Sequence, residues 1–464
     1  MAKTTDIRVK QFAIEFVPVE TRVPLKFGSE TLLSVTVGRA KAVVEDRTGK
    51  AATGIGETPL SIQWVWPSAL PYADRHEALI SFSKWLAKQW GESHEFGHPI
   101  ELSHLFQECY LGKSEASFDE RAGEPIPYLG RLVVASIFDQ AIHDAFGVLH
   151  EMDTYETYQS EFMTRDLADF LEPANGADVS FKGKFPDAFL VADAPRQLPV
   201  WHLVGGLDPI TPEQLTGDEP DDGYPVLLET WIERDGLECL KIKLRGNDQQ
   251  WDYERLVSIG EISMRTGVKW LTADFNCTVT DPAYVNEILD RLESEHKTIF
   301  DMVLYVEQPF PYDLQKHAID VHSVSKRKPL FLDESAHDWK YVKLGAELGW
   351  SGVALKTCKT QTGALLSLCW AKAHGMPLMV QDLTNPMLAQ IPHVRLAAHA
   401  GTIMGVESNG MQFYPDASAA EEAVHPGLYR RRKGRLDLST ISGPGFGYRI
   451  DEINRKYFQD SDVE

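Results

Sequence analysis

The sequence lacks several features that mark other classes of protein. It has five cysteines, an odd and scattered set without a Cys-x-x-Cys pair, so we expect reduced thiols rather than a disulfide framework. It contains no run of eighteen uninterrupted apolar residues, and its first residues have no apolar secretion signal. We therefore expect a cytoplasmic protein without a membrane partner.

Positive charge is also scarce. Lysine and arginine total 46 residues against 68 aspartates and glutamates, which gives a formal net charge of −22. Such a chain repels phosphate backbones and anionic bilayers, so we expect no nucleic-acid partner. The largest basic cluster, residues 430–433, is interpreted as a solvated loop face, with an anion contact as the alternative. The hydrophobic share of 43% is typical of a folded globular chain.

The first third of the chain predicts a domain of mixed strands and helices. Apolar and polar residues alternate through 7–16, 32–37 and 42–45, which is typical of hairpin strands. The period becomes helical through 76–90 and 131–149. We expect an α+β capping domain over residues 1–155.

From about residue 195 the sequence repeats one pattern, in which a short apolar run ends in a polar residue and a helical stretch follows. Near-continuous apolar strands alternating with helices indicate a parallel sheet that is buried on both faces. Eight runs predict a (β/α)8 TIM-type barrel over residues 156–435, with an open doubly wound sheet as the alternative. The runs are 198–206, 240–243, 269–274, 302–307, 329–333, 352–356, 376–382 and 402–407.

The last residues, 436–464, are expected to return to the capping domain. Within them, residues 441–450 combine a Gly/Pro turn with an alternating pattern that favours a further strand.

Carboxylates end three successive predicted strands, at Asp274, Glu307 and Asp333. Within a few ångströms of one another they would repel strongly unless a divalent cation neutralised them. An all-oxygen set without His or Cys favours Mg²⁺ over Zn²⁺. The ion could hold a substrate carboxylate and take up the charge of an enediolate. Taken singly, each carboxylate could instead cap the helix after its strand.

Lysines end two other predicted strands. Lys241 and Lys243 are two residues apart, so the strand pleat points both side chains the same way. Like charge and partial burial would lower the pKa of such lysines toward values that suit a general base, and one could instead hold a substrate carboxylate. Lys356 ends the sixth strand, nearly opposite the second in a ring of eight, which suits proton transfer on two faces of a substrate. Lys359 is its competitor, and a solvated edge lysine is the alternative for either.

Several motifs together resemble the muconate-lactonizing-enzyme subgroup of the enolase superfamily, also known as the mandelate racemase/muconate lactonizing enzyme family. They are Lys-x-Lys at 241–243, Asp-x-Asn at 274–276, Glu-Gln-Pro at 307–309, Asp-Glu-Ser at 333–335 and Lys-x-x-Lys at 356–359. Residues 24–28 and 54–57 are similar to the specificity loops of its capping domain.

The resemblance implies roles for particular residues. Lys243 and Lys356 would be the acid/base pair, with Lys241 beside them. Asp274, Glu307 and Asp333 would bind Mg²⁺. Asn276 and Glu334 would support those ligands.

Two departures from the family pattern leave the substrate open. Residues 360–363 stand where paired glycines are usual, and residues 407–409 read Glu-Ser-Asn rather than the Asp-x-Asp of dipeptide epimerases. Asp382 ends the seventh strand, where mandelate-racemase relatives have histidine, so the lysine/histidine variant of those relatives is disfavoured. Asp382 and Glu407 are candidates for substrate contact. We expect removal of the proton alpha to the carboxylate of a small molecule, followed by epimerisation, β-elimination or cycloisomerisation. We also expect a homo-oligomer.

A competing motif lies at residues 94–98, which read His-Glu-Phe-Gly-His and match the zinc-peptidase pattern H-E-x-x-H. That mechanism needs His94 and His98 on one face of a helix, with Glu95 as the base. Pro99 and Gly97 both oppose helical geometry there, so we expect a loop in the capping domain. A third possibility is a carboxylate- or sugar-acid-binding barrel without turnover, for which two opposed lysines would be unnecessary.

Overall fold

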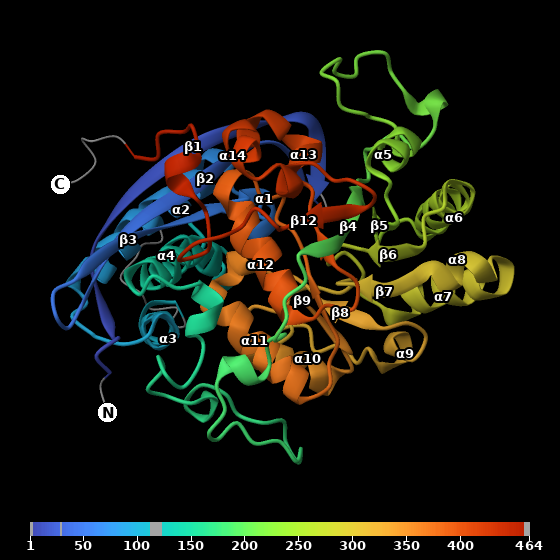
Figure 1. Cartoon of the computed structure of the whole chain (residues 1–464). Coiled ribbons are helices and arrows are strands. Elements are labelled where there is room, and N and C mark those ends of the chain that lie inside the picture. Colours follow the sequence, from blue (N-terminus) through green and yellow to red (C-terminus); the bar gives the residue numbers. More distant parts are fainter. Residues whose placement is uncertain (1–2, 28–29, 112–122, 459–464) are drawn as a thin grey trace.

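The computed structural model describes residues 3–27, 30–111 and 123–458. A long, curved antiparallel sheet forms the cap, in the strand order β1-β2-β3, and α2 and α4 pack against it (Figure 1). The cap elements are β1 Ile7–Phe27, β2 Glu30–Asp46, β3 Ala51–Pro59, α1 Ile62–Val65, α2 Tyr72–Glu92, α3 Pro99–Tyr110 and α4 Tyr128–Leu149. The two predicted segments 32–37 and 42–45 are parts of one strand, β2.

Glycines allow β3 to lie directly against α4. A Cβ added at Gly54 would lie 2.1 Å from the backbone nitrogen of Ala145, and one at Gly56 would lie 2.1 Å from the carbonyl oxygen of Ile137. No side chain larger than hydrogen fits at this separation. The sequence patterns did not predict β3, because a glycine-rich strand lacks the branched and aromatic side chains that indicate strands.

Helix α4 is the core helix of the cap. It is the one helix among the described residues that is long and apolar enough to cross a membrane. However, 94% of its most apolar eighteen-residue window is buried inside the protein. Both faces of α4 are occupied, because it packs against the sheet and also contacts the barrel through Asp139, Gln140 and His143.

The eight predicted barrel strands are all present. Their hydrogen-bonded order follows the sequence from β4 to β10, and β11 pairs in parallel with β4. The amide of Ile403 donates to the carbonyl of Leu378 across the remaining gap, between β10 and β11, at 2.9 Å. The barrel prediction is therefore confirmed, and the open-sheet alternative is wrong. The strands are β4 Gln197–Val204, β5 Cys239–Lys243, β6 Trp270–Asp274, β7 Val303–Glu307, β8 Leu330–Leu332, β9 Gly352–Leu355, β10 Leu378–Val380 and β11 Val406–Glu407.

Helices surround this barrel, as the alternating pattern predicted (Figure 1). Residues 150–196 connect the cap to β4 through turns and short 3-10 helices. The helices are α5 Leu228–Asp235, α6 Gln249–Thr266, α7 Pro282–Glu295, α8 Lys297–Met302, α9 His322–Ser325, α10 Trp339–Leu348, α11 Gln361–Ala373, α12 Gln390–Ala400, α13 Gly410–Phe413, α14 Ala419–Val424 and α15 Pro426–Tyr429.

The C-terminal segment returns to the cap but not as the expected strand. Strand β12 (Arg435–Asp437) pairs antiparallel with the start of β4. The predicted strand within 441–450 is wrong, because Gly443, Gly445 and Gly447 all have positive φ and turn the chain repeatedly. These turns still reach α4, where the amide of Phe446 donates to Asp144 at 2.8 Å.

The close packing of β3 on α4 gives the first testable prediction. Gly54→Ala and Gly56→Ala should each destabilise the protein by about 1–3 kcal/mol, the usual cost of overpacking a filled interior. Urea unfolding measures the change. Gly91→Ala is the matched control, because a Cβ at Gly91 would meet nothing within 4 Å. Equal stability of all three variants would show that the glycines are not required.

Candidate active site

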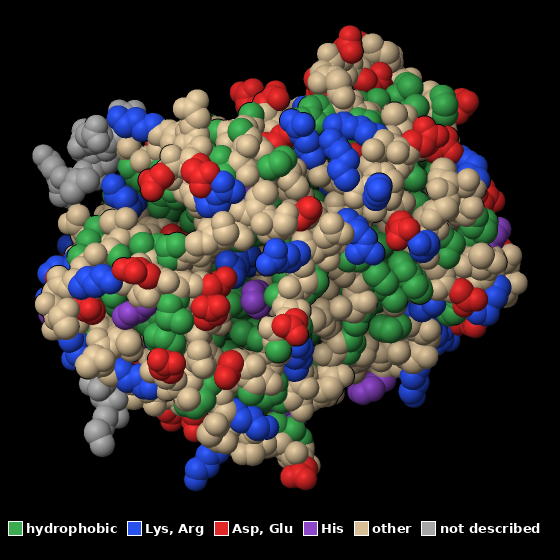
Figure 2. Space-filling model, viewed as in Figure 1, with side chains coloured by type: hydrophobic (Ala, Val, Ile, Leu, Met, Phe, Trp, Pro, Cys, Tyr) green, Lys and Arg blue, Asp and Glu red, His purple; other side chains and the backbone are tan. Residues whose placement is uncertain are grey.

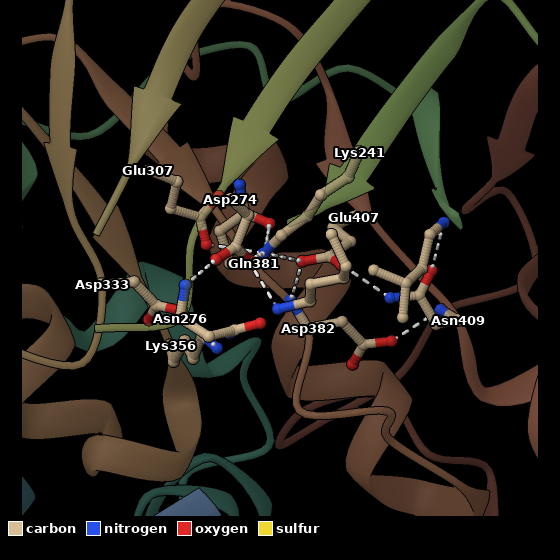
Figure 3. Close-up of polar contacts among 12 residues, drawn as sticks. Lys241, Asp274, Asn276, Glu307, Asp333, Lys356, Gln381, Asp382, Glu407 and Asn409 are labelled. Carbon is tan, nitrogen blue, oxygen red and sulfur yellow. Dashed lines mark hydrogen bonds and ion pairs between the residues drawn. The ribbon is translucent and has the colours of Figure 1, made fainter. Parts of the chain in front are cut away.

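The sequence-predicted site residues gather at the carboxyl ends of the barrel strands (Figure 3). Each stands in the last part of a strand or just after it. Because parallel barrel strands all place their carboxyl ends on one face, these side chains share that face. All are buried except Asn276, which is partly exposed. They are Lys241 and Lys243 on β5, Asp274 and Asn276 at β6, Glu307 on β7, Asp333 and Glu334 after β8, Lys356 after β9, Asp382 after β10 and Glu407 on β11.

Lys241 lies among three of the carboxylates. Its Nζ is 2.6 Å from Glu307 Oε1, 3.1 Å from Asp274 Oδ2 and 3.2 Å from Glu407 Oε2. Gln381 also accepts a hydrogen bond from this ammonium, at 3.2 Å. The lysine therefore draws the ends of β5, β6, β7 and β11 together.

The other lysines each pair with one carboxylate. Lys243 Nζ lies 2.5 Å from Asp274 Oδ2, and Lys356 Nζ lies 2.8 Å from Asp333 Oδ2. Lys359 donates to the backbone carbonyl of Asp333 and lies 3.5 Å from its Oδ1. The two predicted catalytic lysines thus contact different carboxylates, on opposite sides of the cluster.

These contacts raise the pKa of Lys241, whereas the sequence led us to expect a lowered pKa. Burial lowers the pKa of Lys241, but Glu307, Glu407 and Asp274 together raise it well above its ordinary value. The expectation of a lowered pKa was wrong for this lysine, because carboxylates rather than like charges surround it. Burial raises the pKa of Glu307 well above its ordinary range despite Lys241. Burial also lowers the pKa of Lys359.

The charge balance of the cluster tests whether a metal fits. Buried carboxyl groups outnumber buried lysines at these strand ends, where Asp274, Glu307, Asp333, Glu334, Asp382 and Glu407 are found with Lys241, Lys243, Lys356 and Lys359. With all six carboxyl groups ionised, the excess of two negative charges would match one divalent cation. Glu307 Oε2 and Glu334 Oε2 are also buried without a hydrogen-bond partner.

In this structure the carboxylates of the cluster surround the lysine ammonium groups. In the described ranges no three acidic, histidine or cysteine side chains stand close enough to share an ion, because ammonium groups lie between the carboxylates. A cation would therefore replace lysine contacts. With their excess negative charge and unpaired oxygens, the all-oxygen donors fit Mg²⁺.

Gln308, the middle residue of the Glu-Gln-Pro motif, fixes the loop after β8. Its Oε1 accepts from the amides of Asp333 and Ser335, at 2.8 and 3.2 Å. Its Nε2 donates to Ser335 Oγ at 2.7 Å. A buried amide that makes all these bonds sets the position of the Asp333 carboxylate.

Strained backbone occurs at the same strand ends. Asn276, Cys277, Gln308 and Thr360 have φ values of 48°, 62°, 31° and 72°, in the left-handed region that non-glycine residues rarely adopt. Each follows a predicted site residue by one to four positions. Such strain is kept where the surrounding structure and function require it.

The cap supplies residues that the motifs did not identify. Trp64 donates from Nε1 to Glu334 at 2.9 Å, and Lys356 Nζ lies 4.4 Å from the centre of a Trp64 ring. Gln140 of α4 donates to the carbonyl of Thr357 at 3.3 Å. The cap therefore covers the lysine of β9 and holds the loop after it. No signal in the sequence alone links a tryptophan on α1 to a lysine so distant in the chain.

The barrel region matches a known sequence family. Residues 225–454 match the family described as enolase C-terminal domain-like. This chain belongs to the enolase superfamily. The resemblance inferred from the strand-end motifs is thereby confirmed, as is the expectation of an enzyme.

Solved structures of superfamily enzymes share the whole fold. A muconate lactonizing enzyme from Pseudomonas fluorescens is 14% identical with a TM-score of 0.61, over 95% of this chain and 96% of its own. A dipeptide epimerase from Enterococcus faecalis is 15% identical with a TM-score of 0.63, over 95% and 99%. An N-succinyl Arg/Lys racemase from Bacillus cereus is 13% identical with a TM-score of 0.60, over 96% and 97%. Comparison with curated protein sequences finds no match.

The two segments that are similar to superfamily specificity loops lie in cap strands. Residues 54–57 belong to β3, where Glu57 pairs with Arg39 and accepts from the amide of Leu388 at 2.8 Å. Residues 24–27 end β1, and Gly28 lies outside the described residues. Leu25, near that end, packs with Leu203 of the barrel. Residues 24–27 and 54–57 thus contact the barrel as parts of strands rather than as loops, and their role in specificity stays a prediction.

The two candidates for substrate contact are already satisfied within the protein. The Asp382 carboxylate accepts from the amides of Asn385 and Asn409, at 2.9 and 2.6 Å. Glu407 accepts from Lys241, from the amide of Asp382 and from the side chain of Asn409. These partners favour a role in holding Lys241 and the nearby loops.

The zinc-peptidase alternative is not supported by the geometry. His94 and Glu95 lie in an irregular segment, and His98 is the N-cap of α3 rather than part of a helix with His94. The His98 ring is buried and accepts from the amide of Ile100 at 3.2 Å. The two histidines are therefore not on one helical face, as Pro99 led us to expect.

The role of Gln308 gives the second prediction. Gln308→Leu should leave the amides of Asp333 and Ser335 unpaired, at about 1–3 kcal/mol for each buried group. Urea unfolding measures this loss of stability. Gln315→Leu, at an exposed site, is the matched control and should change stability little. Indistinguishable unfolding of the two variants would contradict the positioning role.

Proposed function

We propose that this chain is a Mg²⁺-dependent isomerase or lyase that removes the proton beside the carboxylate of a small molecule. The observation that carries the proposal is the placement of Lys243 and Lys356. They follow strands four positions apart in the ring of eight and contact separate members of one carboxylate cluster. A substrate held between them would meet a lysine on each face.

Asp274, Glu307 and Asp333 are the residues that would hold the metal. They end or follow three neighbouring strands, and their charges repel one another in the buried cluster. Bound there, Mg²⁺ would supply positive charge that stabilises the negative charge developing on the substrate carboxylate. Lys241 would keep Glu407 in place beside it.

The lysines carry the proton transfers. One Nζ takes the alpha proton, and the other returns a proton to the opposite face or assists departure of a leaving group. Trp64 lies over Lys356 and bonds Glu334, so the cap would exclude water from this lysine while substrate is bound. Epimerisation, β-elimination and cycloisomerisation share the first of these steps.

The substrate class follows from the same charges. Lysines buried beside carboxylates suit a small carboxylate anion, and the net charge of −22 disfavours a nucleic acid. Structural relatives are complexed with muconolactone or with dipeptides. We propose muconate-type acids, dipeptides and N-succinyl amino acids as the first compounds to test, and we propose a cytoplasmic enzyme.

Proton exchange tests the proposed chemistry. In D₂O with Mg²⁺, the protein should incorporate deuterium alpha to the carboxylate of at least one acid in such a library, as detected by NMR. Lys243→Ala and Lys356→Ala should each lower turnover by a factor of roughly 10² or more, because each removes an acid/base group. Lys326→Ala, an exposed control, should retain full turnover. Wild-type turnover in both site variants would contradict the role assignment.

Thermal unfolding tests the metal site. Mg²⁺ should raise the unfolding temperature of the wild-type protein, because a ligand that binds only the folded state stabilises it. Asp333→Asn should weaken this response by removing one ligand. Asp193→Asn, at an exposed position, should preserve it. A response that is unchanged in Asp333→Asn would place the metal elsewhere.

A further inference from the structure

Positive charge gathers on one face of this strongly acidic protein. In Figure 2 the Lys and Arg side chains cluster in the upper right part of the view, over the region of β12 and α5. The cluster combines the basic run at residues 430–433 with Arg234 of α5 and Arg435 of β12. Its members are Arg234, Arg430, Arg431, Arg432, Lys433 and Arg435; they are called the basic cluster below.

A rigid turn presents part of the basic cluster. Arg432 and Arg435 exchange backbone hydrogen bonds of 3.1 and 3.0 Å around a two-residue turn. Lys433 has φ 52° in that turn, a position that glycine or asparagine usually occupies. Gly236, at the end of α5, fits tightly here, since a Cβ on it would lie 2.9 Å from Lys433 Cα. A lysine kept at a strained position in a well-packed turn indicates a use for its charge.

Two cavities adjoin the basic cluster and share Arg430 and Arg432 in their walls. One, of about 280 Å³, is lined by Tyr224, Trp231 and Arg234 as well as by Arg431. The other, of about 420 Å³, is lined by Lys433 and Arg435. Both are large enough for a phosphate or diphosphate group and lie outside the predicted active site.

Arg431 lines the smaller cavity with one side-chain nitrogen left without a partner. The residue is 1% exposed, and Nε donates to Asp235 at 2.7 Å. Nη1 makes long contacts with Ser408 and Gln412, at 3.4 and 3.3 Å. Nη2 has no hydrogen-bond partner, although a buried guanidinium nitrogen normally has one.

Nearby carboxylates do not cancel this charge. Asp235 forms an ion pair with Arg431, and Glu422 forms one with Arg430. Asp437 lines the larger cavity, where the hydrogen bond from the amide of Ser439 leaves its negative charge in place. In the described residues, no carboxylate ion pair is recorded for Arg432, Lys433 or Arg435. Arg432, Lys433 and Arg435 therefore outnumber Asp437 around the larger cavity.

We propose that the basic cluster is a binding site for a small multivalent anion of the phosphate class, separate from the carboxylate site of the barrel. Arginine forks suit phosphate oxygens, and Arg430 and Arg432 line both cavities. The net charge of −22 opposes a long polyanion such as a nucleic acid, so a small anion is favoured. Free phosphate and the phosphate group of a metabolite share this chemistry.

Isothermal titration calorimetry tests the site with inorganic phosphate, pyrophosphate and ADP. Titrations of the full chain are run in chloride buffer with Mg²⁺ and repeated with excess EDTA. Pyrophosphate should bind at millimolar concentrations or below in both buffers, and more tightly than inorganic phosphate. Tighter binding of ADP than of pyrophosphate would identify a nucleotide as the source of the phosphate, and the reverse would identify the free anion.

Charge-removing variants locate the binding. Arg432→Ala and Lys433→Ala should each weaken pyrophosphate binding at least fivefold, whereas Lys326→Ala, an exposed lysine before β8, should leave it unchanged. Asp333→Asn should also leave it unchanged, which distinguishes this site from the proposed metal site. The absence of binding at 10 mM pyrophosphate, or equal affinity in all four variants, would overturn the proposal.

Discussion

The excess of buried carboxylates at the mouth of the barrel is the constraint on which the remaining structure depends. Asp274, Glu307, Asp333 and Glu407 are tolerated in the interior because neighbouring lysines compensate them, and removing one partner of a buried pair costs about 3–5 kcal/mol. Lys241 alone faces Asp274, Glu307 and Glu407, which come from three different strands. The ends of the barrel strands are therefore held in register by charge as well as by backbone hydrogen bonds.

The cap completes this arrangement through close backbone packing. Because Gly54 and Gly56 let β3 lie against α4, the helix comes close enough for Gln140 to hold the loop after Lys356. Trp64, just beyond β3, then lies over that lysine. Packing within the cap thus determines the environment of a side chain on the barrel, which explains why the two domains form one enclosed site.

Periodicity predicted the barrel well because strands buried on both faces are apolar throughout and end in polar residues. The sequence predicted less where the local pattern and the packing disagree. Strand β3 is rich in glycine, and the expected strand at 441–450 is broken by glycines with positive φ. The strand-end residues of the site could be identified, but their partners could not. The lysine–carboxylate pairing, which reverses the expected pKa shift of Lys241, depends on contacts between distant segments.

We propose that Asp274, Glu307 and Asp333 exchange their lysine partners for one divalent cation. A crystal structure with Mn²⁺ in place of Mg²⁺ tests it most directly, because anomalous scattering locates the ion without assumptions about the side chains. The claim predicts a single strong peak within about 2.0–2.3 Å of oxygens from all three carboxylates, with Lys241 displaced from Glu307. No peak at this position, or the ion bound instead beside His94 and His98, would contradict it.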